Sequence, residues 1–243
     1  MQCIVTAGPT YEELDKVRRL TNFSTGRLGS ELASFLTERG HEVTLLRGYY
    51  STWHGQTGSK HAQTFTTTAD LRQRLMGLAG TGVKAVFHAA AVSDFGFGKI
   101  WSRSADGQLT EVQSGKLTTR GGALLAELVP TKKIIHHLRD WFEDACIVGW
   151  KYEVEGSRET VLNLARRQLT ESRTDACVAN GSAYGHGFGL VPANGDVADL
   201  PDRVRLFEAL DEFAKTLICL RTKFPPPCGA RGTATGRPEV YPT

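Results

Sequence analysis

Short apolar runs alternate with segments of helical periodicity along most of this chain, and this alternation limits the possible folds more than any other feature. The runs are almost wholly apolar, which is typical of parallel strands covered on both faces. They lie at residues 3–7, 42–46, 85–90, 146–150 and 176–180. Apolar residues recur with helical spacing at 28–36, 71–78, 134–141, 164–169 and 206–217. The pattern predicts an α/β fold with a doubly wound, mostly parallel, Rossmann-like sheet.

Two regions interrupt this rhythm. Residues 95–130 contain glycines, lysines and an alternating stretch at 123–129, so we expect an inserted β-arm there. Residues 221–243 hold five prolines and show no periodicity, which predicts a disordered tail. The remaining residues, 1–220, are enough to bury one good core, and we expect them to form a single domain.

Charge and cysteine content narrow the function classes. Lys+Arg 29 against Asp+Glu 26 leaves a formal net charge of +3, without the basic stripe that would make nucleic acid an expected partner. The five cysteines include no C-x-x-C pair, and three lie in predicted strands, where cysteine acts as a small hydrophobe. No apolar run reaches the length of a membrane span, and the start of the sequence shows no charged n-region or apolar core of the kind expected in a signal peptide. We therefore expect a cytoplasmic protein with reduced thiols and no membrane association.

Two glycine-bearing loops stand between the first predicted strand and the first predicted helix. Residues 8–10 read Gly-Pro-Thr, and residues 22–26 read Asn-Phe-Ser-Thr-Gly. Converging loops at a helix start leave backbone N–H groups available to an anion. Arg18, Arg19 and Arg27 add positive charge. The stretch predicts a nucleotide or a phosphorylated substrate, although a plain turn remains an alternative.

A nicotinamide-binding oxidoreductase is the main competing reading of these loops. Residues 6–10 lack the second and third glycines of the dinucleotide fingerprint, and the second predicted strand ends without an acid to hold a ribose. The chain also has no Tyr-x-x-x-Lys pair and no Walker A loop. These features disfavour NAD(P) as a cofactor.

Other candidate site residues follow the later predicted strands. Alanines at 89–91 would let a ligand approach the backbone closely, and Asp94 could accept hydrogen bonds from a substrate. Trp150 could stack on a base and Asn180 could hydrogen-bond its edge, although they could equally be a core residue and a turn residue.

Lys116 lies in the predicted arm, where a single lysine is usually just solvated. Nucleotidyl transfer, however, needs a mobile cation to neutralise charge on phosphate oxygens.

Six motifs resemble those of the phosphopantothenate–cysteine ligase (phosphopantothenoylcysteine synthetase) family of coenzyme A biosynthesis. They read TAGPT, VRRLTNFSTGRLG, AAAVSDF, GKLTT, GWK and VAN, in the family's order, and cover about residues 1–191. Each is modest alone, but six in register make a specific match.

The resemblance implies a nucleotide-binding synthetase domain over residues 1–220 that joins 4′-phosphopantothenate to cysteine. The substrate carboxylate would attack the α-phosphate of ATP or CTP and release pyrophosphate. The cysteine amine would then displace the nucleoside monophosphate and leave an amide. Mg²⁺ would accompany the triphosphate, so no dedicated metal site and no flavin are expected. The resemblance also implies a homodimer.

The resemblance further assigns roles to individual residues. Lys116 would support acyl-nucleotide formation, and Asn22 would contact the substrate and matter for turnover of that intermediate. Arg18 would grip the substrate phosphate, reaching over from the neighbouring subunit. The pantothenate portion would be held by Ala90, Ala91 and Asp94. The triphosphate cradle and the surroundings of the base would be formed by Gly8, Ser24, Gly26, Gly29, Trp150 and Asn180.

Three departures from the family pattern bear on these roles. Glu171 stands where a nucleotide-binding lysine often sits, Gly181 follows Asn180 where an aspartate is usual, and Trp150 replaces a phenylalanine. The preference between ATP and CTP therefore stays open. A non-catalytic nucleotide-binding relative remains an alternative.

Overall fold

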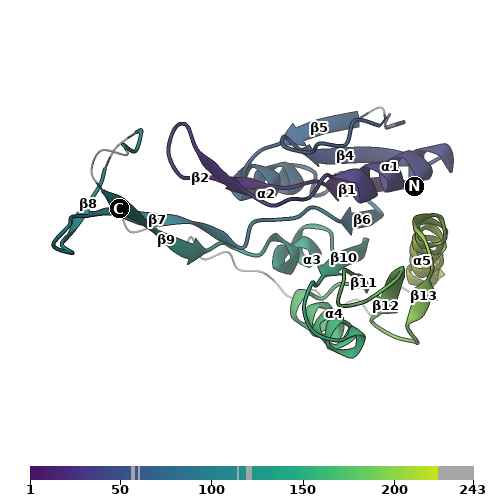
Figure 1. Ribbon diagram of the computed structural model, residues 1–243. Helices are drawn as coiled ribbons and strands as arrows, with labels where there is room; N and C mark the ends of the chain where they lie inside the picture. Colours follow the sequence, from purple (N-terminus) through teal and green to yellow (C-terminus); the bar gives the residue numbers. More distant parts are fainter. Residues whose placement is uncertain (56–57, 60, 114, 119–121, 224–243) are drawn as a thin grey trace.

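The computed structural model describes residues 1–55, 58–59, 61–113, 115–118 and 122–223, and it contains one large sheet and two smaller ones (Figure 1). The strands of the large sheet are β1 (Gln2–Ala7), β4 (Glu42–Gly48), β5 (His61–Phe65), β6 (Ala85–His88), β10 (Cys146–Tyr152), β11 (Ala176–Asn180), β12 (Phe188–Pro192) and β13 (Ala198–Leu200). They are ordered β13-β12-β11-β10-β6-β1-β4-β5. From β11 to β5 every pairing is parallel, whereas β12 and β13 are antiparallel additions.

The order of the parallel strands places a ligand crevice beside β1. The chain builds β1, β4 and β5 in one direction, then returns to β6, β10 and β11 on the other side of β1. The strand order thus reverses between β1 and β6. In open α/β sheets, ligands bind outside the carboxyl ends of the strands at such a switch point. The predicted doubly wound, mostly parallel fold is confirmed.

Helices cover both faces of this sheet. They are α1 (Arg27–Glu38), α2 (Thr68–Gly77), the 3₁₀ turn η1 (Ile134–His137), α3 (Leu138–Trp141), α4 (Arg158–Ser172) and α5 (Arg203–Lys223). One face packs on α1 and α5, the other on α2, α3 and α4. Because strand side chains alternate between faces, Val5 points to the first layer and Ile4 to the second, and both are fully buried. Burial on both sides explains the continuous apolar runs.

The predicted arm is confirmed as a separate antiparallel sheet of β7 (Phe95–Arg103), β8 (Leu109–Glu111) and β9 (Ala123–Pro130), ordered β8-β7-β9. A hairpin of β2 (Tyr11–Glu13) and β3 (Arg19–Thr21) precedes α1. In Figure 1 the arm and this hairpin project from the same side of the main sheet. Both leave the sheet near the switch point, since β2 follows β1 and β7 follows β6.

Several element boundaries differ from the predictions. The expected helix at 134–141 is a 3₁₀ turn followed by a single α turn, and helix α5 continues to Lys223, three residues into the expected tail. The rest of that tail, 224–243, lies outside the described residues. Edge strand β5 was not predicted from the sequence, because all but its last residue are exposed and it therefore has no apolar run.

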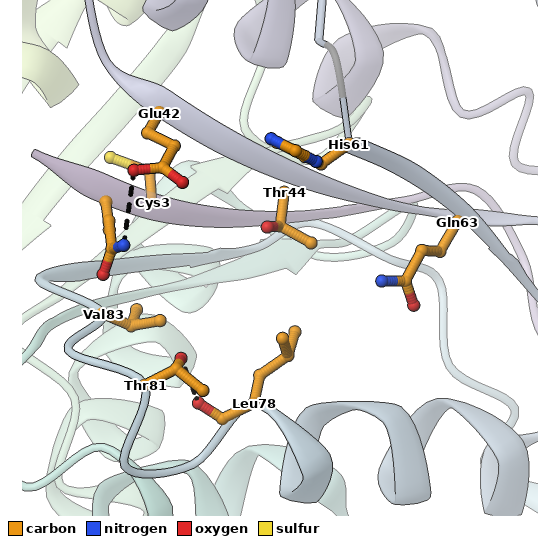
Figure 2. A pocket seen from close by; sticks show the side chains of 9 residues that line it. Cys3, Glu42, Thr44, His61, Gln63, Leu78, Thr81 and Val83 are labelled. Carbon is orange, nitrogen blue, oxygen red and sulfur yellow. Dashed lines mark hydrogen bonds between the residues drawn. The ribbon is translucent and has the colours of Figure 1, made fainter.

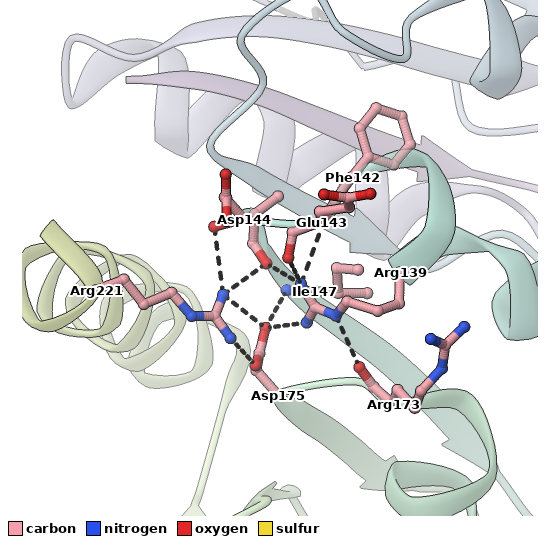
Figure 3. A network of polar contacts seen from close by, with 9 residues as sticks. Arg139, Phe142, Glu143, Asp144, Ile147, Arg173, Asp175 and Arg221 are labelled. Carbon is pink, nitrogen blue, oxygen red and sulfur yellow. Dashed lines mark hydrogen bonds and ion pairs between the residues drawn. The ribbon is translucent and has the colours of Figure 1, made fainter. Parts of the chain in front are cut away.

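A polar network explains why α5 remains ordered past residue 220 (Figure 3). The Asp175 carboxylate, just before β11, accepts hydrogen bonds from Arg139 Nη2 at 2.8 Å, Arg221 Nη2 at 2.5 Å and the Ile147 amide at 2.8 Å. Arg139 also donates to the Ala145 carbonyl at 2.8 Å. The network joins the end of α5 to α3 and the amino ends of β10 and β11.

The strand cysteines behave as the sequence suggested. Cys3, Cys146 and Cys177 are buried and free. Burial raises the pKa of each thiol to about 12, so these thiols are protonated near neutrality. Cys219 is free and exposed, and Cys228 lies outside the described residues. Among the helices that the structure describes, none is both long and apolar enough to cross a bilayer.

A buried carboxylate on α5 predicts acid sensitivity. Asp211 is 1% exposed and lies 2.7 Å from His41 Nε2, 2.8 Å from Lys215 Nζ and 3.3 Å from Arg39 Nε. Burial alone would raise the pKa of Asp211, but hydrogen bonds from Lys215 and His41 outweigh it and lower that pKa. A carboxyl whose pKa falls on folding stabilises the fold above its unfolded value, and loses that contribution as pH drops through the folded value.

We therefore expect Asp211→Asn to cost about 1–2 kcal/mol of unfolding free energy at pH 7, because two of the partners are half exposed. The penalty should begin to shrink as the pH falls below about 4, the ordinary pKa of an aspartate, and should go on shrinking as the pH approaches the lower pKa of the folded carboxyl. Urea unfolding of both proteins between pH 7 and pH 3 measures this, with exposed Asp196→Asn as control. An equal penalty at both ends of the range would contradict the prediction.

Candidate active site at the carboxyl edge of the sheet

The two predicted glycine loops meet at the switch point. Gly8 follows β1 with φ +82°, and Gly26 caps α1 with φ +76°. A Cβ placed on Gly26 would lie 3.2 Å from the Gly8 Cα, so the loops touch through their backbones. Only glycine accepts both this backbone conformation and this approach. The expected convergence of the loops is present in the fold.

The loop after β4 forms a third wall of this cradle. Ser51 Oγ would lie 1.9 Å from a Cβ on Gly8 and 2.7 Å from one on Gly26, and Trp53 N donates to Thr25 O at 3.1 Å. The Ser51 hydroxyl is buried and has no hydrogen-bond partner among the described atoms. A polar group left unsatisfied at an amide-rich loop suits an incoming anion. Sequence reasoning missed Ser51, although its place just after a predicted strand was a usable signal.

Helix α1 points its amino terminus at the cradle because it packs directly on β1. A Cβ on Gly29 would meet the Ala7 Cβ at 2.7 Å and the Thr6 carbonyl oxygen at 2.9 Å. The first turn of α1 carries no acidic side chain. Ser24, half-buried, lies in the loop that leads into this turn. The arrangement favours a negatively charged ligand through the helix dipole and the first-turn amides.

The alanine segment after β6 lies against the first loop. Ala91 N donates to the Gly8 carbonyl at 3.0 Å, and Thr10 N donates to the Ala91 carbonyl at 3.1 Å. Asn22 Nδ2 donates to the same Ala91 carbonyl at 3.2 Å, and Ala90 N donates to Thr6 Oγ1 at 3.0 Å. The structure thus brings Asn22, Ala90 and Ala91 beside the glycine cradle.

A histidine supports this segment from inside the sheet. His88, at the end of β6, is buried, and its Nδ1 lies 2.9 Å from Thr6 Oγ1. Burial lowers the pKa of His88 to about 4, so the ring is neutral near pH 7. Sequence reasoning did not single out His88, because an isolated histidine in an apolar strand carries no pattern.

Asp94 begins the arm and has a cationic partner. Its carboxylate forms an ion pair with Lys133, and both side chains are more than half exposed. Thr131 N donates to the Asp94 carbonyl at 2.9 Å, and Ser93 N donates to Thr10 Oγ1 at 2.8 Å. The segment that leaves β9 therefore lies against the strand end that was predicted to bind substrate. No role had been assigned to Lys133 from the sequence.

Arg18 and the Lys116 loop come together within one protomer. Arg18 Nη1 donates to Asp15 Oδ2 at 2.7 Å and to the Leu117 carbonyl at 3.3 Å. The described arm loop, 115–118, therefore docks on the tip of the β2–β3 hairpin. Lys116 itself is exposed. The expected reach of Arg18 to a neighbouring subunit stays a prediction.

Asn180 ends β11, and Trp150 lies two residues before the end of the neighbouring strand β10. Trp150 Nε1 and Asn180 Oδ1 are both buried and have no partner among the described atoms. In the β10–β11 register Tyr152 lies opposite Asn180, so Trp150 and Asn180 share a sheet face. A cavity of about 480 Å³ opens beside Asn180, and Trp150 does not line it. It is lined by Tyr152, Asn180, Gly181, Ser182, Gly185, His186, Gly187, Phe188, Pro201, Asp202 and Arg203. Sequence reasoning identified only its Asn180 edge.

Glu171 lies away from this cavity. It occupies the last turn of α4, where Arg167 Nε donates to it at 2.6 Å, and this hydrogen bond lowers the pKa of Glu171. Helix α4 leads into the start of β11, whereas Asn180 ends that strand. The two residues are thus near opposite ends of β11, and Glu171 does not oppose a ligand beside Asn180.

A second cavity, of about 230 Å³, lies at the opposite, amino edge of the sheet (Figure 2). Glu42, Thr44, His61 and Gln63 line it from β4 and β5. None of the predicted site residues borders it. The predicted residues instead gather at the carboxyl edge or on the arm and hairpin beside it.

The fold and this edge define a doubly wound α/β protein with an amide-lined cradle at its switch point and an inserted β-arm. A family model described as "DNA/pantothenate metabolism flavoprotein C-terminal domain" matches residues 1–202, and the chain belongs to this family. This confirms the family expected from the six motifs.

Similar proteins include the "Coenzyme A biosynthesis bifunctional protein CoaBC" of Thermococcus kodakarensis, 33% identical over 73% of this chain and 40% of that protein. The chain thus spans less than half the length of that relative. A "DNA/Pantothenate Metabolism Flavoprotein from Streptococcus pneumoniae" has a similar structure, with TM-score 0.77, 23% identity and coverage of 89% of this chain and 99% of that one. So does a "Cab2 mutant H337A complex with phosphopantothenate-cysteine", with TM-score 0.68, 18% identity and coverage of 91% and 88%.

Proposed function

We propose that this chain is a ligase that joins 4′-phosphopantothenate to cysteine through an acyl-nucleotide, using ATP or CTP. The observation that carries the proposal is the meeting of Gly8, Gly26 and the unpaired Ser51 hydroxyl at the switch point. That cradle adjoins the segment after β6, where Asn22 Nδ2 donates to the Ala91 carbonyl. The names of its relatives in coenzyme A biosynthesis support the same assignment.

In the first step, a carboxylate oxygen of phosphopantothenate attacks the α-phosphorus of the nucleotide. The bond from that phosphorus to the bridging oxygen breaks, and pyrophosphate leaves with the electron pair. Backbone amides near Gly8 and Gly26 hold the triphosphate, and the Lys116 ammonium neutralises charge that grows on its oxygens. Magnesium would enter with the triphosphate, which suits a cradle of amides and hydroxyls better than a cage of carboxylates.

In the second step, the cysteine amine attacks the acyl carbon, the acyl–oxygen bond to phosphate breaks, and the nucleoside monophosphate leaves. The amine proton passes to solvent or to the departing phosphate. Asn22 and the Ala90–Asp94 segment hold the acyl portion, and Trp150 with Asn180 surrounds the base. Both steps need orientation and charge neutralisation more than a strong base, so a site without a catalytic triad is adequate.

The working form in this proposal is a homodimer joined through the arm. Strand β9 is exposed along its whole length. Its exposed large apolar side chains are Leu124, Leu125, Leu128 and Val129. An apolar strand of this kind is normally covered, and a second copy of the arm would match its chemistry. Sedimentation equilibrium of the full chain tests the dimer, and a monomer at micromolar concentration would refute it.

Pyrophosphate release tests the proposed reaction. The full chain is incubated with ATP, CTP, GTP or UTP, and phosphopantothenate and cysteine are omitted in turn. We expect release to require phosphopantothenate, and sustained turnover to require cysteine as well. Triphosphate binding without any release would favour a non-catalytic relative. NAD(P)H binding without release would favour an oxidoreductase.

A further inference from the structure

The tip of the β2–β3 hairpin is fastened to the arm loop by one buried carboxylate. The Asp15 side chain is 1% exposed. Its Oδ1 accepts hydrogen bonds from the Val17 amide at 2.8 Å and the Arg18 amide at 2.6 Å. Its Oδ2 accepts from Arg18 Nη1 at 2.7 Å and from the Leu117 amide at 3.0 Å. One oxygen therefore shapes the hairpin turn, while the other reaches the arm.

Further contacts surround this junction. Lys16 N donates to the Gly115 carbonyl at 3.1 Å, so the residues on both sides of Lys116 are bonded to the hairpin. Leu117 is buried, with 4% of its surface exposed. The Leu117 amide and the other donors hold the pKa of Asp15 below its usual value, so the Asp15 carboxylate is charged near neutrality. The backbone of the Lys116 loop is thus fixed from both sides.

We propose that Asp15 is a positioning residue that presents Lys116 to the reacting triphosphate. The inference rests on the proposed function for its catalytic consequence. Asp15 acts on the reaction only through the groups it holds, since its four acceptor contacts are all to the chain itself. Because the backbone of this loop is already fixed, the Lys116 side chain loses less conformational freedom when its ammonium group is placed against a phosphate oxygen.

Asp15→Asn separates the two roles of the side chain, which are shaping the hairpin turn and bonding to the arm loop. The amide oxygen still accepts from the Val17 and Arg18 backbone and keeps the hairpin turn. The NH₂ group that replaces Oδ2 is a donor, and it cannot accept from the Leu117 amide or from Arg18 Nη1. We expect pyrophosphate release at saturating nucleotide to fall about 10-fold, because displacing a catalytic group costs less than removing it. The KM for the nucleotide should change little.

Two readouts distinguish positioning from general damage. Trypsin should cut the Lys116–Leu117 bond several times faster in Asp15→Asn than in the wild type, because the loop is released. In a Lys116→Gln background, Asp15→Asn should cause almost no further loss, since its effect passes through that lysine. Asp106→Asn, at the exposed β7–β8 turn of the same arm, is the matched control and should behave as wild type.

Wild-type cleavage together with wild-type activity in Asp15→Asn would overturn the proposal. A full 10-fold loss on top of Lys116→Gln would overturn it as well, because Asp15 would then act by another route. If the wild-type chain itself releases no pyrophosphate, the proposed function fails and the catalytic role of Asp15 fails with it. The cleavage rate still decides independently whether Asp15 holds the loop.

Discussion

Lys116→Gln is expected to lower phosphopantothenate-dependent pyrophosphate release by about 100- to 1,000-fold, the range for loss of one charge-stabilising donor in a preorganised site. Glutamine keeps a polar side chain of similar reach but carries no charge. The negative charge that grows on the triphosphate oxygens then lacks the cation that neutralises it. Single-turnover release with saturating ATP or CTP measures the effect, and the KM for the nucleotide should change far less than the rate.

Lys99→Gln provides the matched control for this variant. Lys99 lies on β7 of the same arm, is more than half exposed, and pairs with Glu111 at 3.1 Å. Exposed pairs of this kind contribute little to stability, so this variant should fold and react like the wild type. Wild-type release rates in Lys116→Gln, with an unchanged fold by circular dichroism, would remove the lysine from the mechanism.

Asn22→Asp is expected to slow amide formation by about 100-fold, while the acyl-nucleotide accumulates on the protein. The Asn22 amide donates to the Ala91 carbonyl at 3.2 Å. An aspartate would place a carboxylate against that carbonyl oxygen and beside the phosphate cradle. The intermediate would then form, but its acyl carbon would be poorly oriented toward the incoming amine. Rapid quenching followed by mass spectrometry measures the trapped species.

Asn163→Asp, on the exposed side of α4, introduces the same charge change far along the chain from the cradle. It should leave product formation unchanged. Normal amide formation by Asn22→Asp without a detectable intermediate would disprove the assigned role. Loss of pyrophosphate release as well would place Asn22 in the first chemical step instead of the second.

Much of the sheet could be predicted because its strands are buried on both faces. Strands β1 and β10 are recognisable in the sequence as apolar runs, and apolar residues at helical spacing predict the helices that cover them. The antiparallel strands β12 and β13 were not predicted. Strand β13 has two exposed residues out of three, and it joins the sheet only by pairing with β12. Such a strand depends on tertiary context more than on its own pattern.

The residues of the candidate site also fall into those that could be predicted from the sequence and those that could not. Gly8 and Gly26 were predictable because a glycine loop has a local sequence pattern and a local conformational reason. Ser51 and Asp15 were not, because their importance comes from contacts between segments distant in the sequence. Asp15 meets Leu117 about a hundred residues away, at 3.0 Å. Spacing along the chain carries no information about such a partner.

The backbone contact between Gly8 and Gly26, together with the seating of α1 on β1 at Gly29, has a thermodynamic consequence for ligand binding. These segments are ordered when the protein folds, so a triphosphate meets walls that need no rearrangement. Little conformational entropy is then lost at those loops on association, and the binding free energy is not spent on assembling them. Hydrogen exchange of the bonded amides around the cradle, those of Thr10, Trp53 and Ala91, should therefore be slow even before any nucleotide is added.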